Sequence, residues 1–526
     1  RTPDILGKNV TIHLGGRTWY RYSFFDVGGN SLRATKLVYK INQHLSVRIS
    51  VRNVFEWQTI EQMAQYINQM EQQVNQSIVK ATEKEYYPIS SAQMRMYIMS
   101  MKAGEELTYN MSGLFMLEGA LDQTRLDAAF QQLVDRHESL RTAFKAIHGE
   151  PKQIIYPEVK FVIESIQAVE EEVEDQVEQF VRAFDLGQAP LMRAGLIELR
   201  QDCHVLLVDL HHIIADGLSV QILMTELGQL YREEKLPPLR IQYKDYAEWQ
   251  QFQLHSDWMK KQEQYWLEVF SEKIPLLELP IDYERRESPR YEGDLLEIAV
   301  NEELVISLRK LEAQTGATLY MILLAAYTIL LSKYSGQEDI IVGMPIAGRT
   351  HAELEPVMGM FVNTLAVRHQ PAADKTFAAY LLEVKEHMLN AYENQDYPFE
   401  ELIKKVDLNK DVRRNPLFDT MFVLQNSGPS EMHMDGLTCK PVAPNNRVSK
   451  FDLTLYVTES DQQIDAAFEY STILFEKTTI AAMSQHLLLI LTTICCEPHI
   501  KINQIKFPEE DMNEGTLTDL IEMDFF

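Results

Sequence analysis

The stretch from His204 to Tyr231 limits the folds open to this chain more than any other part of the sequence. Residues 204–210 (HVLLVDL) are short and apolar, as in a buried strand, and residues 218–231 carry apolar side chains at helical spacing. The loop between them holds four notable residues: His211, His212, Asp216 and Gly217. A glycine lets the backbone turn there, and a strand end feeding a loop is a common place for functional groups, because the scaffold is rigid. The junction predicts a mixed α/β fold with a polar site where the strand ends.

The two histidines of this loop cannot both face one cavity. If the strand pleat persists to His212, its side chain shares a face with Leu206 and Val208. His211 then points the other way, with Asp209. Taken alone, the pair reads most simply as two structural histidines with satisfied hydrogen bonds. A metal site is a poorer alternative, because neighbouring strand residues diverge and no further ligand set stands at suitable spacing.

Length and composition exclude several classes of protein. The chain has 526 residues, enough for three hydrophobic cores, and 45% of them are hydrophobic. A formal net charge of −27 argues against nucleic-acid binding. The first residues show no signal peptide, and the longest apolar run, Leu319 to Leu331, is too short to cross a bilayer. No zinc-ligand spacing joins the cysteines, so we expect a reduced, cytoplasmic setting without membrane association: Cys203, Cys439, Cys495 and Cys496.

Residues 1–75 are predicted to form a small helical unit, followed by a polar linker over 76–85. Residues 24–32 (FFDVGGNSL) are a loop that runs into a helix, and a second amphipathic helix is predicted over 60–70. Residues 51–57 between them are predicted to be a short connecting turn. A larger body follows, with its two mixed α/β halves expected over 86–265 and 266–526.

Helices and strands alternate in this body. The predicted helices cover 126–136, 304–311, 319–334, 377–392 and 478–494. The predicted strands cover 140–147, 339–345, 421–425 and 451–457. No residue-level repeat relates the two halves, so the second half is not a sequence copy of the first.

Seven segments of the body, in order, resemble the motifs of the condensation domain of nonribosomal peptide synthetases. They are residues 90–97 (SSAQMRMY), 136–144 (RHESLRTAF), 210–219 (LHHIIADGLS), 243–249 (YKDYAEW), 358–368 (MGMFVNTLAVR), 394–400 (NQDYPFE) and 411–417 (DVRRNPL). Residues 24–32 independently resemble the signature of a peptidyl carrier domain. The resemblance implies a condensation domain of two chloramphenicol-acetyltransferase-like halves in a V, preceded by a helical carrier bundle. One departure is that residues 1–23 lack the acidic amphipathic helix with which such carriers usually begin.

Ser31 has a plain structural interpretation and a functional one. A serine at a helix start is most often an N-cap. With the preceding Asp-x-Gly-Gly-Asn, the resemblance implies that 4′-phosphopantetheine is attached to Ser31. A helix N-terminus favours a phosphodiester, and a long arm raises the local concentration of the acyl group that it carries.

For His212 the resemblance implies a catalytic role in amide formation. The amine of an aminoacyl thioester on a downstream carrier attacks the thioester held on the arm of Ser31. Alignment of the two tethered substrates supplies much of the rate. His212 takes the amine proton, or only orients the amine or stabilises charge, and the sequence leaves these alternatives open. The backbone N–H of Gly217 is a candidate donor to the developing oxyanion.

Asp216 is expected to be structural, because a carboxylate in an apolar loop needs a charged partner. The resemblance implies an arginine, with Arg349 as first choice and Arg141 as second. His211 is also expected to be structural. Further expectations concern the remaining motifs: packing for Tyr97 and residues 243–249, tunnel lining for Asn363 and Thr364, and a helix start at Pro398.

The order of the domains implies that the fused carrier presents the donor. The expected partners are a downstream acceptor carrier, an upstream adenylation domain and a phosphopantetheinyl transferase, and the chain is expected to be a monomeric piece of a longer assembly line that makes antibiotics. Three rivals remain open. They are an epimerisation domain, a non-catalytic recruitment domain of the same fold, and a free acyltransferase that uses a coenzyme A thioester.

Overall fold

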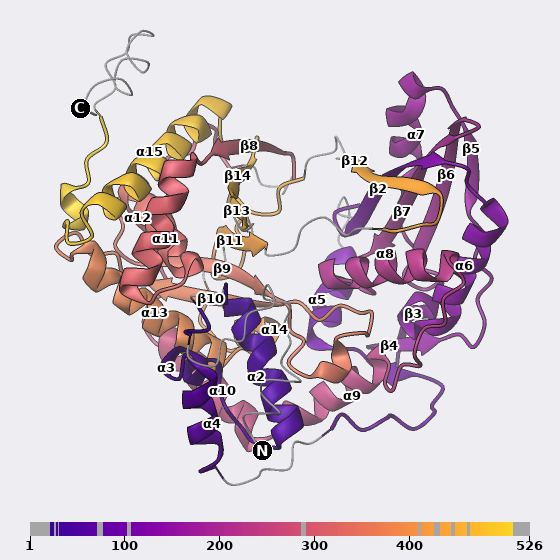
Figure 1. The fold of residues 1–526 in the computed structure, drawn as a ribbon, viewed down its shortest axis with the longest axis horizontal. Helices are drawn as coiled ribbons and strands as arrows, with labels where there is room; N and C mark the ends of the chain where they lie inside the picture. The colour runs from indigo at the N-terminus through magenta and orange to yellow at the C-terminus, as the bar shows by residue number, and fades with distance from the viewer. Residues whose placement is uncertain are drawn as a thin grey trace.

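A computed structural model gives the fold of the chain (Figure 1). It describes residues 22–25, 28–29, 31–70, 77–101, 107–285, 291–408, 411, 413–425, 432–442, 448–459 and 463–508. The doubt whether the first carrier helix is present concerns residues 1–23, and residues 1–21 of this segment lie outside the described residues.

Within its described residues, the amino-terminal unit has three helices: α2 (Ser31–Leu45), α3 (Val51–Glu56) and α4 (Ile60–Ile67). Their apolar faces enclose a small core with Phe24, Leu37 and Val54 fully buried. Thr59 begins α4 by accepting a hydrogen bond from the Gln62 backbone N–H at 3.2 Å. The prediction of a turn over 51–57 was wrong. The six residues of α3 form a helix because Val51, Val54 and Phe55 reach the core together, and tertiary packing decides short helices of this kind.

The first half of the body is built on a five-stranded sheet of order β12-β2-β7-β6-β5. Its bounds are β2 (Asn110–Gly119), β5 (Glu164–Gln167), β6 (Met192–Arg200), β7 (Cys203–His211) and β12 (Leu437–Val442). Every residue of β7 is buried, because Leu206 and Val208 pack toward α6 (Gln123–Arg136) and α8 (Gly217–Tyr231) on one face. Val205 and Leu207 pack with Phe180 of α7 (Val173–Phe180) on the other face.

A small antiparallel sheet completes this half, formed by β1 (Tyr87–Pro88), β4 (Glu150–Ile155) and β3 (Thr142–Ile147). The strand predicted over 140–147 starts two residues late, because a 3-10 turn occupies Glu138–Arg141. The remaining helices of the half are α5 (Ser91–Ser100) and α9 (Tyr243–Gln253), whereas α10 (Asp257–Val269) packs on the second half, in whose core Met259 and Trp266 are buried. The residues before β1 are not a loose linker where they are described: Ile78 is buried, and the Ala81 N–H donates to Asp245 Oδ1 at 2.7 Å.

The second half holds a six-stranded sheet of order β10-β9-β11-β13-β14-β8. Its strands are β8 (Gly293–Ala299), β9 (Ile340–Ile346), β10 (Asn363–His369), β11 (Thr420–Gln425), β13 (Leu453–Glu459) and β14 (Ile464–Ser471). Its helices are α11 (Glu302–Thr315), α12 (Leu319–Ser335), α13 (Phe377–Glu393), α14 (Phe399–Ile403) and α15 (Lys477–Cys496). Phe422, Leu455 and Phe468 lie in register and are buried on the face that the helices cover. The opposite face of the sheet looks toward the first half (Figure 1).

One strand crosses between the halves. β12 comes from the carboxyl-terminal part of the chain, yet it pairs antiparallel with β2, with Leu437 opposite Gly119 and Val442 opposite Leu114. Figure 1 shows it beside β2 at the edge of the first half. The expected division at residue 266 therefore separates the chain in sequence but not in space, because the second segment supplies a strand to the first sheet.

Two helical segments of the second half meet the length and hydropathy of a membrane span: α15, and the bent pair of α11 and α12. In the fold, Ile480, Ile490 and Ile494 of α15 are fully buried in the hydrophobic core of the half. The apolar character of α15 is thus used for packing on its inner face.

Candidate active site between the two halves

Asp216 is the N-cap of α8 and is completely buried. Its Oδ1 accepts the backbone N–H and the hydroxyl of Ser219, both at 2.8 Å. Its Oδ2 accepts the backbone N–H of Phe361 at 3.1 Å, from the second half of the body. The carboxylate therefore ends the loop after β7, begins α8 and contacts both halves.

Arg349 supplies the charge that this buried carboxylate needs. Its Nη1 lies 2.6 Å from Asp216 Oδ2 and its Nη2 lies 3.1 Å from Oδ1, so the pair is bidentate. The guanidinium also donates to the carbonyl of Val357 at 3.1 Å and stacks 4.3 Å from the ring centre of Phe361. The pairing expected from the sequence is present, and it joins the two halves through charges that water hardly reaches.

His212 follows the last residue of β7, and its ring is fixed in one tautomer. Its Nδ1 lies 2.8 Å from the Ala215 carbonyl, which can only accept, so Nδ1 carries the proton. Its backbone N–H donates to the Tyr109 carbonyl at 2.8 Å. Burial, followed by the positive charge of Lys450, lowers the pKa of His212 to about 4. The ring is therefore neutral, with a lone pair on Nε2. His212 is half-buried, so it is not fully enclosed by the fold.

His211 points away from His212 and is satisfied within the first half. Its Nδ1 accepts the Ile213 N–H at 3.1 Å, so its Nε2 carries the proton toward Ser100 Oγ at 3.2 Å. Burial lowers the pKa of His211 to about 3. The ring is neutral and enclosed, as expected for a structural histidine.

A cavity of about 1330 Å³ has walls from both halves and from the amino-terminal unit. Gly217, Gln221 and Thr225 of α8 line it on one side, and residues 345–350 line it on the other. Its wall reaches the histidine loop at Gly217 and β7 at Leu210, but not the ring of His212 itself. A Cβ built on Gly217 would meet no atom within 4 Å. As the first residue of α8, Gly217 also has a backbone N–H without an intrahelical acceptor, and the residue forms part of the cavity wall.

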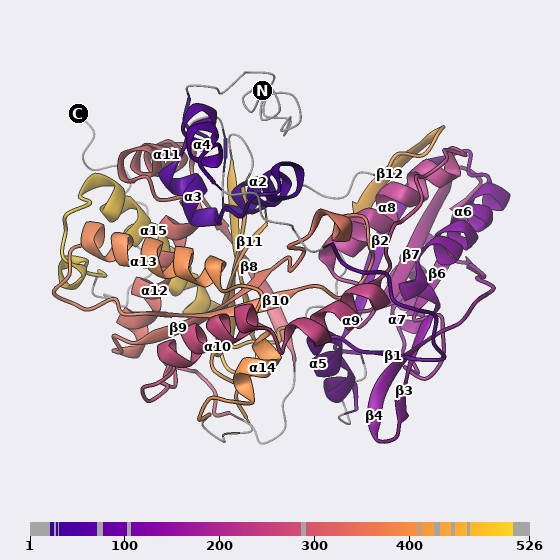
Figure 2. The ribbon, with the colours of Figure 1, turned by 90° about the horizontal axis from the view of Figure 1, so that it is seen from below.

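Helix α2 closes this cavity on the side of the amino-terminal unit, where Thr35, Tyr39 and Lys40 form part of the wall. Ser31 is the first residue of the same helix, one turn before Thr35. The first turn of α2 contains no acidic residue, so its positive end is available to a phosphodiester. Figure 2 shows α2 between the second half and the edge of the first half that carries α8 and β12. These features fit the attachment of 4′-phosphopantetheine at Ser31, on the helix that forms part of the cavity wall.

The amino-terminal unit rests on α13 of the second half through Arg52 of α3 (Figure 2). Its Nη1 lies 2.9 Å from Glu386 Oε2, its Nη2 donates to Asn390 Oδ1 at 3.0 Å, and its Nε lies 3.4 Å from Glu393 Oε1. The ring centres of Tyr39 and His351 lie 6.2 Å apart. This contact holds the unit at the mouth of the cavity.

Three sequence expectations for the site were wrong. Arg141 does not contact Asp216, because it binds backbone carbonyls of its own half, including Val134 at 3.0 Å. Asn363 does not line the cavity. Its amide instead clamps the loop of residues 395–399, donating to the Tyr397 carbonyl at 2.9 Å and accepting the Phe399 N–H at 3.0 Å. Thr364 is buried in β10.

Other motif residues have packing roles. Tyr243 is 2% exposed and its hydroxyl donates to the Met360 carbonyl at 2.5 Å. A Cβ on Gly359 would overlap its ring at 1.8 Å, so the fourth and fifth motif segments pack against each other and require glycine there. Pro398 is the N-cap of α14 rather than its first residue.

No sequence pattern points to Lys450, which the fold brings beside the histidine loop. Its Nζ lies 4.7 Å from the ring centre of Tyr109, whose carbonyl holds His212. Lys450 and His212 are 238 residues apart in the chain, and no local motif connects them. Among the described residues, no group of His, Cys, Asp and Glu has the arrangement of a metal site.

Family models match both parts of the chain. A condensation domain model matches residues 83–516, and a phosphopantetheine attachment site model matches residues 22–67. Among curated proteins, tyrocidine synthase 3 of Brevibacillus parabrevis is 47% identical over 93% of this chain. Gramicidin S synthase 2 of Brevibacillus brevis is 44% identical over 97%, and bacitracin synthase 3 of Bacillus licheniformis is 45% identical over 97%. The chain spans only 8%, 11% and 8% of these three proteins, respectively.

Solved structures share the fold. The X-domain in complex with OxyB from teicoplanin biosynthesis gives a TM-score of 0.78 at 24% identity, covering 83% of this chain and 99% of that one. The four-domain nonribosomal peptide synthetase AB3403, bound to AMP and glycine, gives 0.72 at 22% identity, covering 81% of this chain and 34% of that one. The first condensation domain of the calcium-dependent antibiotic synthetase gives 0.66 at 16% identity, covering 80% and 99%.

Proposed function

Because the chain belongs to the condensation-domain family, with a phosphopantetheine attachment domain ahead of it, we propose that it forms peptide bonds in nonribosomal peptide synthesis. The amine of an aminoacyl thioester on a downstream carrier attacks the acyl thioester carried at Ser31. A C–N bond forms and the C–S bond breaks. The nitrogen loses a proton and the sulfur gains one, so no ATP is needed at this step.

One observation carries the proposal: the loop that holds His212, with its Nδ1 bonded and its Nε2 left bare, also contributes Gly217 to the wall of a large cavity, and the carrier helix forms another part of that wall. Phosphopantetheine on Ser31 supplies a thioester, which is already activated toward amines. The chain's own residues then position the reactants. His212 Nε2 accepts a hydrogen bond from the amine, and the Gly217 N–H donates to the carbonyl oxygen as negative charge develops on it.

The lowered pKa of His212 favours one order of events. An imidazole with a pKa of about 4 is a weak base, so it does not deprotonate a free ammonium ion effectively. It can accept a proton after the C–N bond has formed, when the nitrogen is positively charged and strongly acidic. His212 therefore acts first as a positioning acceptor and then as the base.

The test uses two loaded carriers. Ser31 is loaded with a defined L-aminoacyl group, a separate downstream carrier is loaded with a second amino acid, and intact mass spectrometry follows the dipeptidyl product. The wild-type chain is expected to form the product, whereas Ser31→Ala is expected to give none because it cannot be loaded. A D-aminoacyl group formed on Ser31 without any acceptor would instead identify an epimerase. Binding of partner proteins with neither reaction would identify a recruitment domain.

A further inference from the structure

Lys450 has a backbone that is fixed by the second half of the body. It lies between the bridge of Val448 with Glu292 and the start of β13. Its carbonyl accepts the side-chain amide of Asn415 at 3.2 Å, and the N–H of its neighbour Ser449 donates to the Tyr291 carbonyl at 2.9 Å. Hydrogen bonds of the backbone therefore fix the position of Lys450, independently of the contacts of its side chain.

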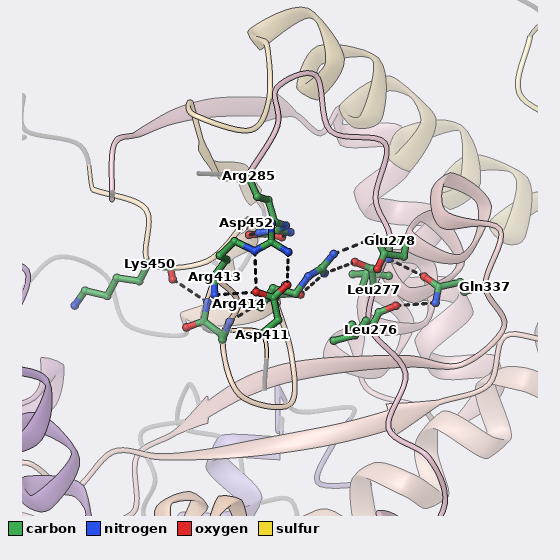
Figure 3. A network of polar contacts seen from close by, with 12 residues as sticks. Leu276, Leu277, Glu278, Arg285, Gln337, Asp411, Arg413, Arg414, Lys450 and Asp452 are labelled. Atoms are coloured by element: carbon green, nitrogen blue, oxygen red, sulfur yellow. Dashed lines mark hydrogen bonds and ion pairs between the residues drawn. The ribbon is translucent and has the colours of Figure 1, made fainter. Parts of the chain in front are cut away.

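An ionic network lies beneath this segment (Figure 3). Arg285 Nη1 binds Asp452 Oδ1 at 2.9 Å, and Arg414 Nη1 lies 2.7 Å from Asp419 Oδ2. The Asp452 N–H donates to the Asp419 carbonyl at 2.9 Å, which joins the two pairs. In Figure 3 the side chain of Lys450 points away from this network, so its charge is not used to balance the carboxylates there.

The tip of Lys450 reaches the first half. Its Nζ lies over the ring of Tyr109, and the Tyr109 carbonyl accepts the backbone N–H of His212. Among the described residues, no carboxylate oxygen lies within 4 Å of this ammonium. Lys450 thus brings a positive charge without a direct counter-ion to the loop that holds the reactive imidazole.

The charged groups around Lys450 and His212 come from several elements. Arg95 of α5 repels the ammonium, although Glu400 of α14 lies 3.8 Å from that arginine. Glu469 of β14 attracts the ammonium, and Asp216 is already paired with Arg349. Burial lowers the pKa of Lys450 to about 8 and raises that of Glu469 to about 7. At neutral pH the lysine is still charged, whereas the glutamate is only partly ionised.

Lys450 lies outside the wall of the cavity that α2 closes. Thr458 and Glu459, at the carboxyl end of β13, line that cavity, whereas Lys450 precedes the amino end of the strand. The seven residues of β13 separate the two positions by roughly 20 Å. The lysine is therefore remote from the part of the cavity wall that Thr458 and Glu459 form.

We propose that Lys450 is a positioning residue whose ammonium keeps the incoming amine and the imidazole of His212 in their neutral forms. This inference rests on the proposed function. An amine attacks only through its lone pair, so a protonated amine is unreactive. A fixed positive charge nearby makes protonation of both nitrogens unfavourable. Lys450 transfers no proton itself, because the proton of the new C–N bond passes to His212 Nε2.

The test is a pH profile of single-turnover condensation, with both carriers loaded, between pH 5.5 and 9. Lys450→Met is expected to move the acidic limb upward by about one pH unit, which is about a tenfold lower rate on that limb. The difference should vanish above about pH 8, where the wild-type lysine loses its proton. Lys450→Arg, which keeps the charge, should retain the wild-type limb.

Lys333→Met is the matched control. Lys333 is also desolvated, with a lowered pKa, and its Nζ lies 5.7 Å from the ring centre of Phe507, but it is on α12 in the helical layer. Its removal should leave the profile unchanged. A Lys450→Met profile that matches the wild type, or that falls by one factor at every pH, overturns the proposal. Lys450→Gln repeats the comparison if the methionine variant does not fold. Absence of product from the wild type at every pH would instead reject the proposed function.

Discussion

Arg349 and Asp216, which stand 133 residues apart in the sequence, form a bidentate ion pair with both side chains nearly inaccessible to solvent. The same carboxylate caps α8, and the same guanidinium binds two carbonyls of its own half. The pair thus couples the geometry of the histidine loop to the contact between the halves. It explains why a charged residue stands in an otherwise apolar loop.

Removal of either partner is expected to lower the free energy of unfolding, because the pair has a structural role. Asp216→Ala leaves Arg349 buried without a counter-ion, which costs about 3–5 kcal/mol. Urea unfolding should show the loss, together with reduced solubility. Asp202→Ala is the control, because its pair with Arg200 is exposed, with 68% and 74% of the two side chains accessible, and should change stability by at most about 1 kcal/mol. An Asp216→Ala variant of native stability that has lost only activity would refute the structural role.

His212→Ala is expected to lower the condensation rate by about 10²- to 10⁴-fold with little change in stability, because it removes the acceptor of the amine proton. The measurement is dipeptidyl product from loaded carriers at saturating acceptor. His44→Ala, at an exposed position on α2, controls for the loss of a histidine. Product formed at the wild-type rate by His212→Ala would exclude the catalytic role.

His369 is expected to make the fold sensitive to acid. It is completely buried, and neither of its ring nitrogens has a hydrogen-bond partner within the described structure. Burial, followed by His387, lowers its pKa to about 3. The unfolded chain binds a proton near pH 6.5 and the folded chain does not, so this contribution to stability is full above pH 6.5 and is lost as the pH falls toward 3.

His369→Leu should remove that dependence. Between pH 7.5 and pH 5 the wild type is expected to lose about 2 kcal/mol more stability than the variant, measured by urea unfolding at both values. Leucine at the exposed His44 serves as the comparison. Equal losses in wild type and His369→Leu would show that the buried ring does not drive the acid response.

Arg52 is expected to control how the carrier unit rests on the body. Arg52→Glu opposes Glu386 and Glu393 and should release the unit, which small-angle scattering would detect as a larger radius of gyration. The double variant Arg52→Glu with Glu386→Arg should restore part of the compact form. Because these side chains are partly exposed, the effect should weaken with salt. A single variant as compact as the wild type would show that the contact does not hold the unit.

The sequence predicted the elements with strong local patterns. The junction of β7 and α8 and the long helices α12 and α13 lie where the apolar spacing placed them. The pair of Asp216 with Arg349 was also expected, but only through the family resemblance. Residues 51–57 were misjudged because six helical residues give too short a periodic signal.

Features that depend on distant contacts were not predictable from local patterns. β12 has the burial pattern of an exposed edge, with two polar side chains facing solvent, so its sequence carries no signal of the sheet that it joins. In the sequence, nothing distinguishes Lys450 from an ordinary surface lysine. Only the fold shows that its ammonium lies over the ring of Tyr109. Asn363 was predicted to line the tunnel, and this was wrong. An asparagine that holds a loop and one that faces a substrate give the same signal in the sequence.

The crossing of β12 limits how the molecule can open. Six residues of this strand are paired with β2, and Lys440 adds an ion pair to Glu118 at 2.9 Å. The two halves cannot separate without breaking the backbone hydrogen bonds between β12 and β2. Under the proposed function, the acyl chain therefore has to reach the histidine loop while the two halves stay joined along this strand.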